Sequence, residues 1–356
     1  MRPVRVALIG YGLAGASFHA PFIATTEGLE LAAIVTRDPG RRAAATGRYP
    51  GVELLDGAEE VFARAADFGL VVVAAPNRAH VTLATAALEA GLDVVVDKPL
   101  APTAAEGRAL VKLAGERGRM LTVFHNRRWD GDLLTVRRLI EAGDLGRVLR
   151  FESRFERFRP QLTEGWRERA DPEDAGGVLY DLGPHLIDQA LLLFGPAVHV
   201  YGEVDVRRTG ARVDDDAFVA MTHASGVRSH LWMSAVTAQV GPRLRVLGDR
   251  AGYVKHGLDV QEAALRDGGD PGGTGWGRED EAAWGVLGTD GNQRRVETEP
   301  GDYGAFYRGV AAALCDGAPP PVDPADTVAG LEAIEAARRS NAEGVVVSRT
   351  GRRGIR

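Results

Sequence analysis

Cysteine is almost absent from the sequence, and several other features are missing. Cys315 is the single cysteine, which excludes an internal disulfide framework and a cysteine-rich metal site. No run of about 18 apolar residues occurs, and Met1–Gly10 resembles a strand rather than a signal peptide. The eight histidines lack the spacing of metal ligands. We therefore expect a soluble, cytoplasmic protein without a bound metal.

Lysine is also scarce, and positive charge is not in excess. Three of the 43 basic residues are lysines (Lys98, Lys112 and Lys255), and the others are arginines. The formal net charge of −6 makes a nucleic acid or an anionic membrane surface an unexpected partner. With 45% hydrophobic and 26% charged residues, the composition is that of a folded protein. The 356 residues predict two domains, at about 150 residues each.

Residues 1–123 alternate apolar strands with helices. Nearly continuous runs of Val, Ile, Leu and Ala predict buried strands at Val4–Ile9, Leu31–Val35, Leu70–Ala74, Val94–Val96 and Met120–Val123. Ala79–Ala90 and Thr103–Arg117 have helical periodicity, and each ends near a glycine, Gly91 or Gly118. This alternation predicts an α/β fold, a doubly wound parallel sheet of the Rossmann type.

Residues 124–356 predict an α+β domain with an open, mainly antiparallel sheet. Half-buried strands are expected at Val148–Arg154, Val198–Val206, Ala217–His223, Arg228–Ser234 and Leu244–Gly248. Helices are expected at Leu133–Ala142, after the glycines near Gly176, and at Pro324–Asn341. Asp267–Gly277 holds six glycines and predicts a mobile loop, in which Trp276 would close on a site or on a partner subunit.

A glycine motif follows the first predicted strand and begins a helix. In Gly10-Tyr11-Gly12-Leu13-Ala14-Gly15, the first glycine permits a tight turn and the second lets a pyrophosphate approach the backbone. The third lets the helix pack on the strand, and the phosphate is then bound at the helix N-terminus. A tight turn without a ligand is the alternative, but the βαβ context favours dinucleotide binding by Gly10, Gly12, Leu13, Ala14 and Gly15.

The end of the second strand indicates which dinucleotide is bound. An NAD site requires a carboxylate there, whereas an NADP site requires Arg and hydroxyl groups for the 2′-phosphate. Thr36 occupies the place of the acid, with Arg37 beside it. We therefore predict NADP, with NAD as the alternative, because Asp38 could serve the ribose and the arginines could be a solvated helix face.

Two segments, Ala74–His80 and Asp97–Pro99, lie at the carboxyl ends of later predicted strands. Ligands of a doubly wound sheet bind in the crevice beyond these ends, so both segments are expected beside the nicotinamide. Lys98 is notable because arginine replaces lysine almost everywhere else, so a compact, proton-exchangeable ammonium is favoured there over an ordinary surface lysine. The candidate residues of these segments are Ala75, Pro76, Asn77, His80, Asp97 and Lys98.

A second dense cluster follows Gly176-Gly177. Pro184 suits the start of a helix, which places His185 in the first turn and Asp188 on the same face. Asp181 precedes that helix. An acid–His–acid group of this kind suits proton transfer, whereas an N-capping Asp with a core His is the alternative.

These motifs together carry a resemblance that covers essentially the whole chain. The glycine motif, Asp97-Lys98-Pro99 and the Gly-Gly…Asp-x-x-x-His-x-x-Asp run resemble the Gfo/Idh/MocA family, that is, glucose–fructose oxidoreductase and inositol dehydrogenase relatives. Further runs are similar to its NADP-dependent scyllo-inositol dehydrogenase branch: Gly12–Gly15, Phe18–Pro21, His125–Asp130, Phe155–Pro160 and Tyr180–Gly183. One departure is Asp97, where the family usually has Glu.

The resemblance implies a Rossmann domain followed by an open-sheet domain that often mediates homodimers or homotetramers. It also implies that Lys98 is the motif lysine, His185 the general acid/base, and Asp181 a ligand of substrate hydroxyls. We therefore expect an NADP-dependent dehydrogenase that oxidises a secondary hydroxyl of a cyclic polyol or sugar. A non-catalytic NADP-sensing regulator and an NAD-dependent glycosidase are the alternatives. Candidate pocket residues, each equally explained as a surface arginine or packed aromatic, are Arg127, Arg157, Arg159 and Trp166.

Overall fold

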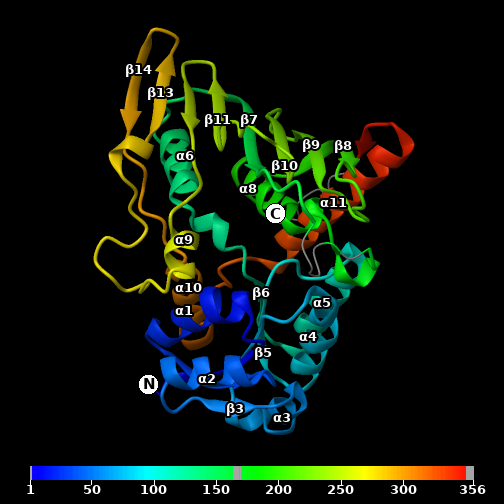
Figure 1. Ribbon diagram of the computed structural model, residues 1–356, viewed down its shortest axis with the longest axis vertical. Coiled ribbons are helices and arrows are strands. Elements are labelled where there is room, and N and C mark those ends of the chain that lie inside the picture. Colours follow the sequence, from blue (N-terminus) through cyan, green and yellow to red (C-terminus); the bar gives the residue numbers. More distant parts are fainter. Residues whose placement is uncertain (1, 163–167, 169, 350–356) are drawn as a thin grey trace. The chain divides into compact units, whose positions relative to one another are not determined.

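The computed structural model describes residues 2–162, 168 and 170–349, and the chain forms two compact units (Figure 1). The first unit comprises Met1–Asn126, Gln261–Trp276 and Asp302–Val328. The second unit comprises Arg127–Val260, Gly277–Gly301 and Ala329–Arg356.

The predicted domain boundary, between residues 123 and 124, lies close to Asn126, where the first segment of the first unit ends. The same prediction assigns residues 261–276 and 302–328 to the second domain. The structure packs both in the first unit. The Phe22 ring explains why, because its centroid lies 6.5 Å from that of Tyr303 and 6.3 Å from that of Trp276. Contacts between aromatic residues this far apart in the chain produce no local sequence pattern, so the sequence does not predict them.

Six parallel strands form the sheet of the first unit, in the order β3-β2-β1-β4-β5-β6. The strands are β1 (Val4–Ile9), β2 (Leu29–Val35), β3 (Glu53–Leu55), β4 (Leu70–Val73), β5 (Asp93–Val96) and β6 (Leu121–Val123). The predicted doubly wound sheet is confirmed, and the structure adds β3, which is too short to show a hydrophobic pattern. The order reverses at β1 and β4, where sheets of this class bind ligands beyond the carboxyl ends of the strands.

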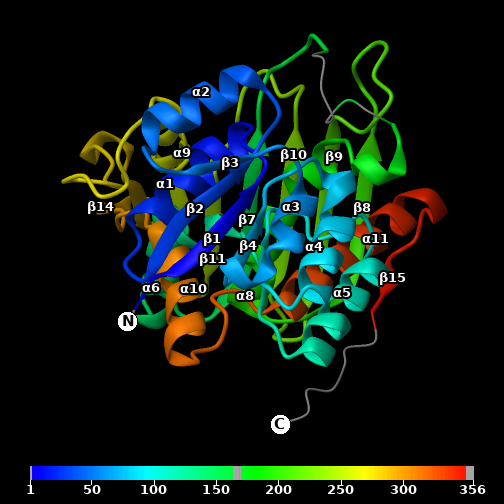
Figure 2. The same ribbon diagram turned by 90° about the horizontal axis from the view of Figure 1, so that it is seen from below.

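Helices cover both faces of this sheet: Figure 2 shows α1 and α2 on one side, and α3, α4 and α5 on the other. Their bounds are α1 (Ala20–Thr25), α2 (Pro39–Arg48), α3 (Ala58–Ala63), α4 (His80–Glu89) and α5 (Ala104–Arg117). The later segments add α9 (Gln261–Arg266) and α10 (Gly304–Asp316) to the unit. Gly118 ends α5 with φ +61°, a left-handed conformation that glycine adopts without strain.

A nine-stranded sheet forms the second unit, in the order β14-β13-β12-β11-β7-β10-β9-β8-β15. Its strands are β7 (Val148–Glu156), β8 (Ala197–Asp205), β9 (Asp216–His223), β10 (Arg228–Ser234), β11 (Leu244–Gly248), β12 (Gly252–Lys255), β13 (Gly285–Thr289), β14 (Asn292–Val296) and β15 (Val347–Ser348). β7 and β10 are parallel, whereas the other neighbouring pairs are antiparallel. The predicted, mainly antiparallel sheet is confirmed.

The sequence did not predict β12 to β15, because these strands are short or exposed: four of the five residues of β14 face solvent. Helix α8 (Gly183–Phe194) packs on β7 and β10, and α7 (Val178–Asp181) packs on β9 and β10. Two further α-helices of the described residues are α6 (Gly131–Glu141) and α11 (Pro324–Glu343). Within the described ranges, no helix combines the length and the apolar character that a membrane span requires.

Candidate active site

Two of the three glycines in the loop after β1 are required by the packing. Gly10 has φ +100°, and a Cβ there would lie 2.4 Å from the carbonyl oxygen of Ala74. A Cβ at Gly15 would lie 2.0 Å from the carbonyl oxygen of Gly10. Both distances are too short for real atoms, so any side chain would displace backbone. Gly10 thus permits the turn, and Gly15 permits the close approach of helix and strand.

Gly12 is different, because the space beside it is open. Among the described residues, a Cβ at Gly12 would meet only Nη1 of Arg41, at 3.9 Å. Leu13 is exposed and precedes a π-helical segment, Ala14–His19, that continues into α1. Open space above a glycine, next to the N–H groups at the start of a helix, fits the pyrophosphate of a dinucleotide.

Thr36 and Arg37, which the sequence predicts to bind the 2′-phosphate of NADP, follow the end of β2 directly. Thr36 is buried, and Nε of Arg37 donates a hydrogen bond to the carbonyl oxygen of Asp56 at 2.8 Å. Asp38 caps α2, since its Oδ1 accepts a hydrogen bond from a backbone N–H of the first turn at 2.8 Å. One oxygen of the alternative ribose ligand is therefore engaged within the protein. The contacts of Thr36 and Arg37 with a cofactor stay predictions.

His80 connects the segments that follow β4 and β5. Its Nδ1 lies 2.7 Å from the carbonyl oxygen of Pro99, and its Nε2 lies 2.9 Å from that of Ala75. The residue is 1% exposed. The structure therefore gives His80 a positioning role, and its predicted contact with the cofactor stays a prediction. Asn77 is buried beside this connection, whereas Pro76 is exposed.

Asp97 and Lys98 come directly after β5. Oδ1 of Asp97 accepts a hydrogen bond from the Lys98 N–H at 2.9 Å and lies 3.9 Å from Nε2 of His19. Nδ1 of His19 is 2.6 Å from the hydroxyl of Tyr307. Burial pushes the pKa of Asp97 upward, but the contact with His19 and the charge of Lys98 outweigh this and lower it. Burial and the nearby Asp97 raise the pKa of Tyr307 well above its ordinary value.

The second unit carries Asp181 and His185 on consecutive helices. Asp181 ends α7 and His185 lies in the first turn of α8, and they are 6% and 7% exposed. Asp188, one turn later, accepts two hydrogen bonds from Arg128: Nε to Oδ2 at 2.8 Å and Nη2 to Oδ1 at 2.6 Å. This buried pair attaches the chain before α6 to α8. A role of Asp188 in proton transfer stays a prediction.

Two of the predicted pocket arginines meet at one aromatic ring. The guanidinium carbons of Arg127 and Arg157 lie 4.8 and 4.9 Å from the ring centroid of Phe155. Arg127 is buried, whereas Arg159 is exposed. Trp166 lies outside the described residues. The sequence did not identify Phe155 as the shared contact, because inward-facing residues of a strand have the same pattern whatever they touch.

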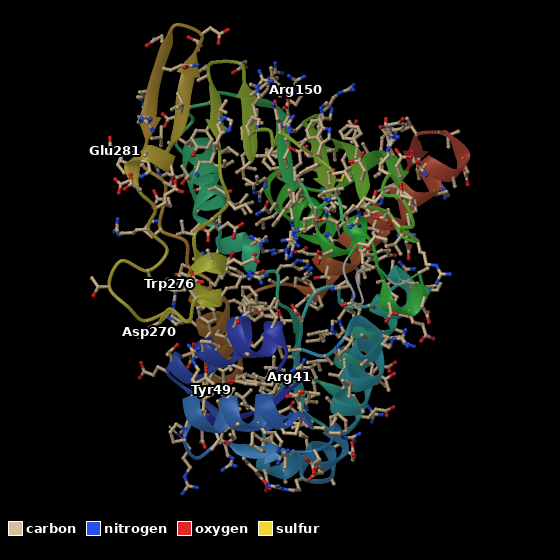
Figure 3. The ribbon with its side chains drawn as sticks, in the orientation of Figure 1. Arg41, Tyr49, Arg150, Asp270, Trp276 and Glu281 are labelled. Atoms are coloured by element: carbon tan, nitrogen blue, oxygen red, sulfur yellow. The ribbon has the colours of Figure 1, made fainter. Side chains whose placement is uncertain are left out.

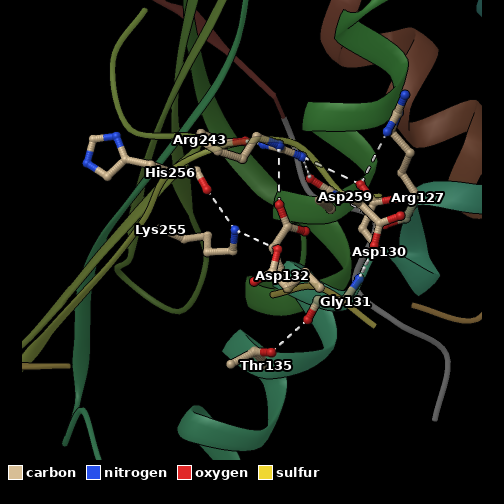
Figure 4. Close-up of polar contacts among 12 residues, drawn as sticks. Arg127, Asp130, Gly131, Asp132, Thr135, Arg243, Lys255, His256 and Asp259 are labelled. Atoms are coloured by element: carbon tan, nitrogen blue, oxygen red, sulfur yellow. Dashed lines mark hydrogen bonds and ion pairs between the residues drawn. The ribbon is translucent and has the colours of Figure 1, made fainter. Parts of the chain in front are cut away.

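Buried charges surround the start of α6, where Asp130 and Asp132 meet two arginines (Figure 4). The carboxylate of Asp130 lies 3.4 Å from Arg127 and 3.9 Å from Arg243, and Asp132 lies 3.5 Å from Arg243. Burial raises the pKa of Asp130 to about 8, the charges of Asp259 and Asp132 add to this rise, and the two arginines oppose it. Asp130 therefore binds its proton up to a higher pH than an exposed aspartate does. Neither this cluster nor any other His, Cys, Asp or Glu group in the described ranges could hold a metal ion.

The raised pKa of Asp130 predicts that the stability of the protein depends on pH. Since the unfolded carboxyl loses its proton near pH 4, the folded state holds one more proton up to about pH 8. The free energy of unfolding is therefore expected to fall as the pH rises from about 5 to 7.5, by at most about 1.4 kcal/mol per pH unit from this group. In urea unfolding, Asp130→Asn should flatten this dependence, whereas Asp290→Asn, at an exposed turn, should not. Equal pH slopes for wild type and Asp130→Asn would contradict the assignment.

Trp276, at the end of the glycine-rich loop, is held within the first unit (Figure 3). Its Nε1 donates a hydrogen bond to Oε1 of Gln261 at 3.1 Å, and its ring meets Phe22 edge-on. The same oxygen of Gln261 accepts a hydrogen bond from the Tyr303 N–H at 2.7 Å. In this state Trp276 belongs to the aromatic core of the unit, and its closing on a site stays a prediction.

Comparisons with known proteins agree with this architecture. Residues 4–125 match the model of an oxidoreductase family with an NAD-binding Rossmann fold, and residues 133–254 match the GFO/IDH/MocA C-terminal domain. The chain is 41% identical to the uncharacterised oxidoreductase YdgJ of Escherichia coli K12, over 93% of this chain and 94% of that protein. It is 34% identical to the scyllo-inositol 2-dehydrogenase (NADP(+)) IolW of Bacillus subtilis 168, over 96% and 94%.

A solved structure shows that the likeness extends to the fold. YvaA of Bacillus subtilis superposes with a TM-score of 0.92 at 31% identity, and the match covers 98% of this chain and 99% of that one. The family resemblance predicted from the sequence motifs is thereby confirmed.

Proposed function

Because this chain belongs to the GFO/IDH/MocA family of NAD(P)-binding oxidoreductases, we propose that it is an NADP-dependent dehydrogenase that reversibly oxidises a secondary hydroxyl of a cyclic polyol or sugar to the ketone. The observation that carries the proposal is Lys98, which follows β5 in the same unit as the glycine loop and contacts the Asp97 carboxylate through its N–H. The name of IolW, an NADP-dependent inositol dehydrogenase, supports an inositol-like substrate.

NADP supplies the hydride chemistry when it is bound, and the protein supplies the proton and charge chemistry. In the proposal, His185 acts as the general base and accepts the hydroxyl proton. A proton transfer of this kind typically raises the rate by about 10²–10⁴-fold. The ammonium group of Lys98 donates a hydrogen bond to the same oxygen as negative charge develops on it. Asp181 and Arg127 bind the neighbouring hydroxyl groups.

The preference for NADP is supported by the residues after β2. No acidic residue ends that strand, and the nearest acid, Asp38, uses one carboxylate oxygen to cap α2. A carboxylate free to accept both ribose hydroxyls is the feature that favours NAD.

A substrate panel tests the proposal. The purified protein is incubated with NADP+ and a set of inositols, aldoses and glycosides, and NADPH absorbance and glycoside cleavage are both followed. Formation of NADPH with an inositol or sugar is expected. Glycoside cleavage without net reduction of NADP+ would instead support a glycosidase, and cofactor binding without turnover of any compound would support a regulator.

We also propose that a second copy of the chain packs on the outward face of the nine-stranded sheet. Along β9, buried residues alternate with half-exposed ones, and Phe218 and Trp232 lie on the half-exposed face with ring centroids 5.0 Å apart. The guanidinium of Arg154 lies 3.9 Å from the Trp232 ring. Aromatic residues and arginine are enriched at interface cores. Sedimentation of the wild type should therefore show a homo-oligomer, and Trp232→Glu should dissociate it. Leu192→Glu, which changes an exposed position of α8, should leave the oligomer intact. A monomeric wild type would overturn this proposal.

A further inference from the structure

A buried chain of polar groups in the first unit takes no part in the proton and charge chemistry proposed above. It joins Tyr307 of α10, His19 at the end of the π-helical segment after the glycine loop, and Asp97 after β5. Helix α10 packs against α1, which continues that segment (Figure 1). His19 and Tyr307 are completely buried, so neither side chain can touch a cofactor or a substrate. Asp97 is the residue of the candidate site that this chain reaches.

The hydrogen bond at one end of this chain assigns the proton of the His19 ring. The Tyr307 hydroxyl lies 2.6 Å from Nδ1 of His19, and it has no other hydrogen-bond partner in the described ranges. Burial and the charge of Asp97 raise the pKa of Tyr307 well above its ordinary value, so the hydroxyl keeps its proton. Because a buried O–H group without an acceptor is costly, the hydroxyl donates to Nδ1. Nδ1 is then an acceptor, and the ring carries its proton on Nε2.

Nε2 of His19 faces the Asp97 carboxylate at the other end of the chain. It lies 3.9 Å from Oδ1, too far for a direct hydrogen bond, and it forms no hydrogen bond with any other described residue. The Phe124 ring packs against the imidazole, with the two centroids 4.4 Å apart. In a buried site, an N–H group aimed at a carboxylate stabilises its negative charge. Burial raises the pKa of Asp97, and the contact with His19 is the largest of the effects that lower it.

We infer that His19 is a positioning residue for Lys98 that acts through Asp97, and that Tyr307 fixes the tautomer that His19 needs. The inference rests on the proposed dehydrogenase function. Oδ1 of Asp97 is the shared atom, because it faces Nε2 of His19 and accepts the hydrogen bond of the Lys98 N–H at 2.9 Å. A carboxylate held ionised at this point fixes the backbone of Lys98 and keeps a negative charge near its ammonium group. The chain thus orients the group that stabilises the developing negative charge, without touching the reacting atoms.

A double-mutant cycle tests the inference with a substrate found in the panel. Tyr307→Phe keeps the ring and removes only the hydroxyl. It should lower kcat by about tenfold to a hundredfold, whereas KM and NADP+ affinity should change by less than about threefold. In a Lys98→Met background the same substitution should change kcat by less than about twofold, because the residue that it positions is already absent.

Two variants of His19 and a control complete the cycle. His19→Leu should behave like Tyr307→Phe, and His19→Gln should restore part of the rate, since its amide N–H replaces that of Nε2. Thr122→Val removes a buried hydrogen bond of the same unit, from the Thr122 hydroxyl to the Val322 carbonyl oxygen at 2.8 Å. This control should leave kcat unchanged.

The tautomer of His19 is measured without any substrate, by nuclear magnetic resonance of protein labelled with nitrogen-15 in its histidine rings. The signals of His19 are those missing from His19→Gln, and they should show an acceptor at Nδ1 and a proton on Nε2. Tyr307→Phe should remove this preference. A proton on Nδ1 in the wild type would overturn the inference, as would an equal loss of kcat from Tyr307→Phe with and without Lys98, or a change confined to KM. A wild type that oxidises no compound of the panel would overturn the proposed function itself, whereas the spectra test the tautomer independently of activity.

Discussion

Replacing Lys98 with Met or His185 with Ala is expected to lower kcat by about 10²–10⁴-fold each, with NADP+ affinity changed far less. Each substitution removes one group of the proposed proton-transfer machinery, and such groups typically contribute that much in rate. The combined loss in the double variant should be smaller than the product of the two single losses, because both groups act on one transition state. Single-turnover hydride transfer, with a substrate found in the panel, measures the effect without interference from product release.

Matched variants separate chemistry from charge and structure. Lys112→Met removes an exposed lysine of α5 whose ammonium lies 3.4 Å from Glu116, and it should leave kcat unchanged. His256→Ala removes an exposed histidine of the second unit and serves the same purpose. Near-wild-type hydride transfer in Lys98→Met or in His185→Ala would assign that residue a structural role and would favour the regulator hypothesis.

The Rossmann sheet could be predicted because its elements are encoded locally. Buried parallel strands are short apolar runs, and the turn at Gly10 requires a residue that tolerates φ +100°. By contrast, β14 has four exposed residues among its five, so burial imposes no alternating pattern on it, and β13 has only five residues in which to show one. Their position in the sheet depends on the pairing of β13 with β12 and of β14 with β13, which composition alone cannot reveal.

The candidate site was predictable by position but not by contact. The motif around Lys98 places it at the end of a strand, yet nothing near it in sequence announces the hydrogen bond between His19 and Tyr307, which are 288 residues apart. Likewise, the sequence alone does not distinguish the four arginines after β2, which are Arg37, Arg41, Arg42 and Arg48. Which of them pairs with Asp56 and which faces Gly12 depends on side-chain packing across two elements.

Breaking the ion pair between Arg128 and Asp188 is expected to destabilise the protein by about 3–5 kcal/mol, because Arg128→Met removes a positive charge and two hydrogen bonds from a buried carboxylate. The side chains of the pair are 8% and 5% exposed, so water cannot replace the lost hydrogen bonds. Urea unfolding of the wild type and the variant measures the difference. Removing both charges, in Arg128→Met with Asp188→Leu, should recover much of the loss, since no uncompensated charge then stays buried.

An exposed pair of the same length provides the control for this argument. Nη2 of Arg207 lies 2.6 Å from Oδ2 of Asp205, as Nη2 of Arg128 does from Oδ1 of Asp188, but the side chains of the exposed pair are 58% and 43% accessible. Arg207→Met should therefore cost about 1 kcal/mol or less, because water solvates the remaining carboxylate and screens the attraction. Similar losses for Arg128→Met and Arg207→Met would mean that burial does not set the strength of the Arg128–Asp188 pair. A large loss for Arg128→Met alone, recovered in the double variant, would establish that the loss comes from burying the Asp188 carboxylate without the charge of Arg128 on the helix that carries His185.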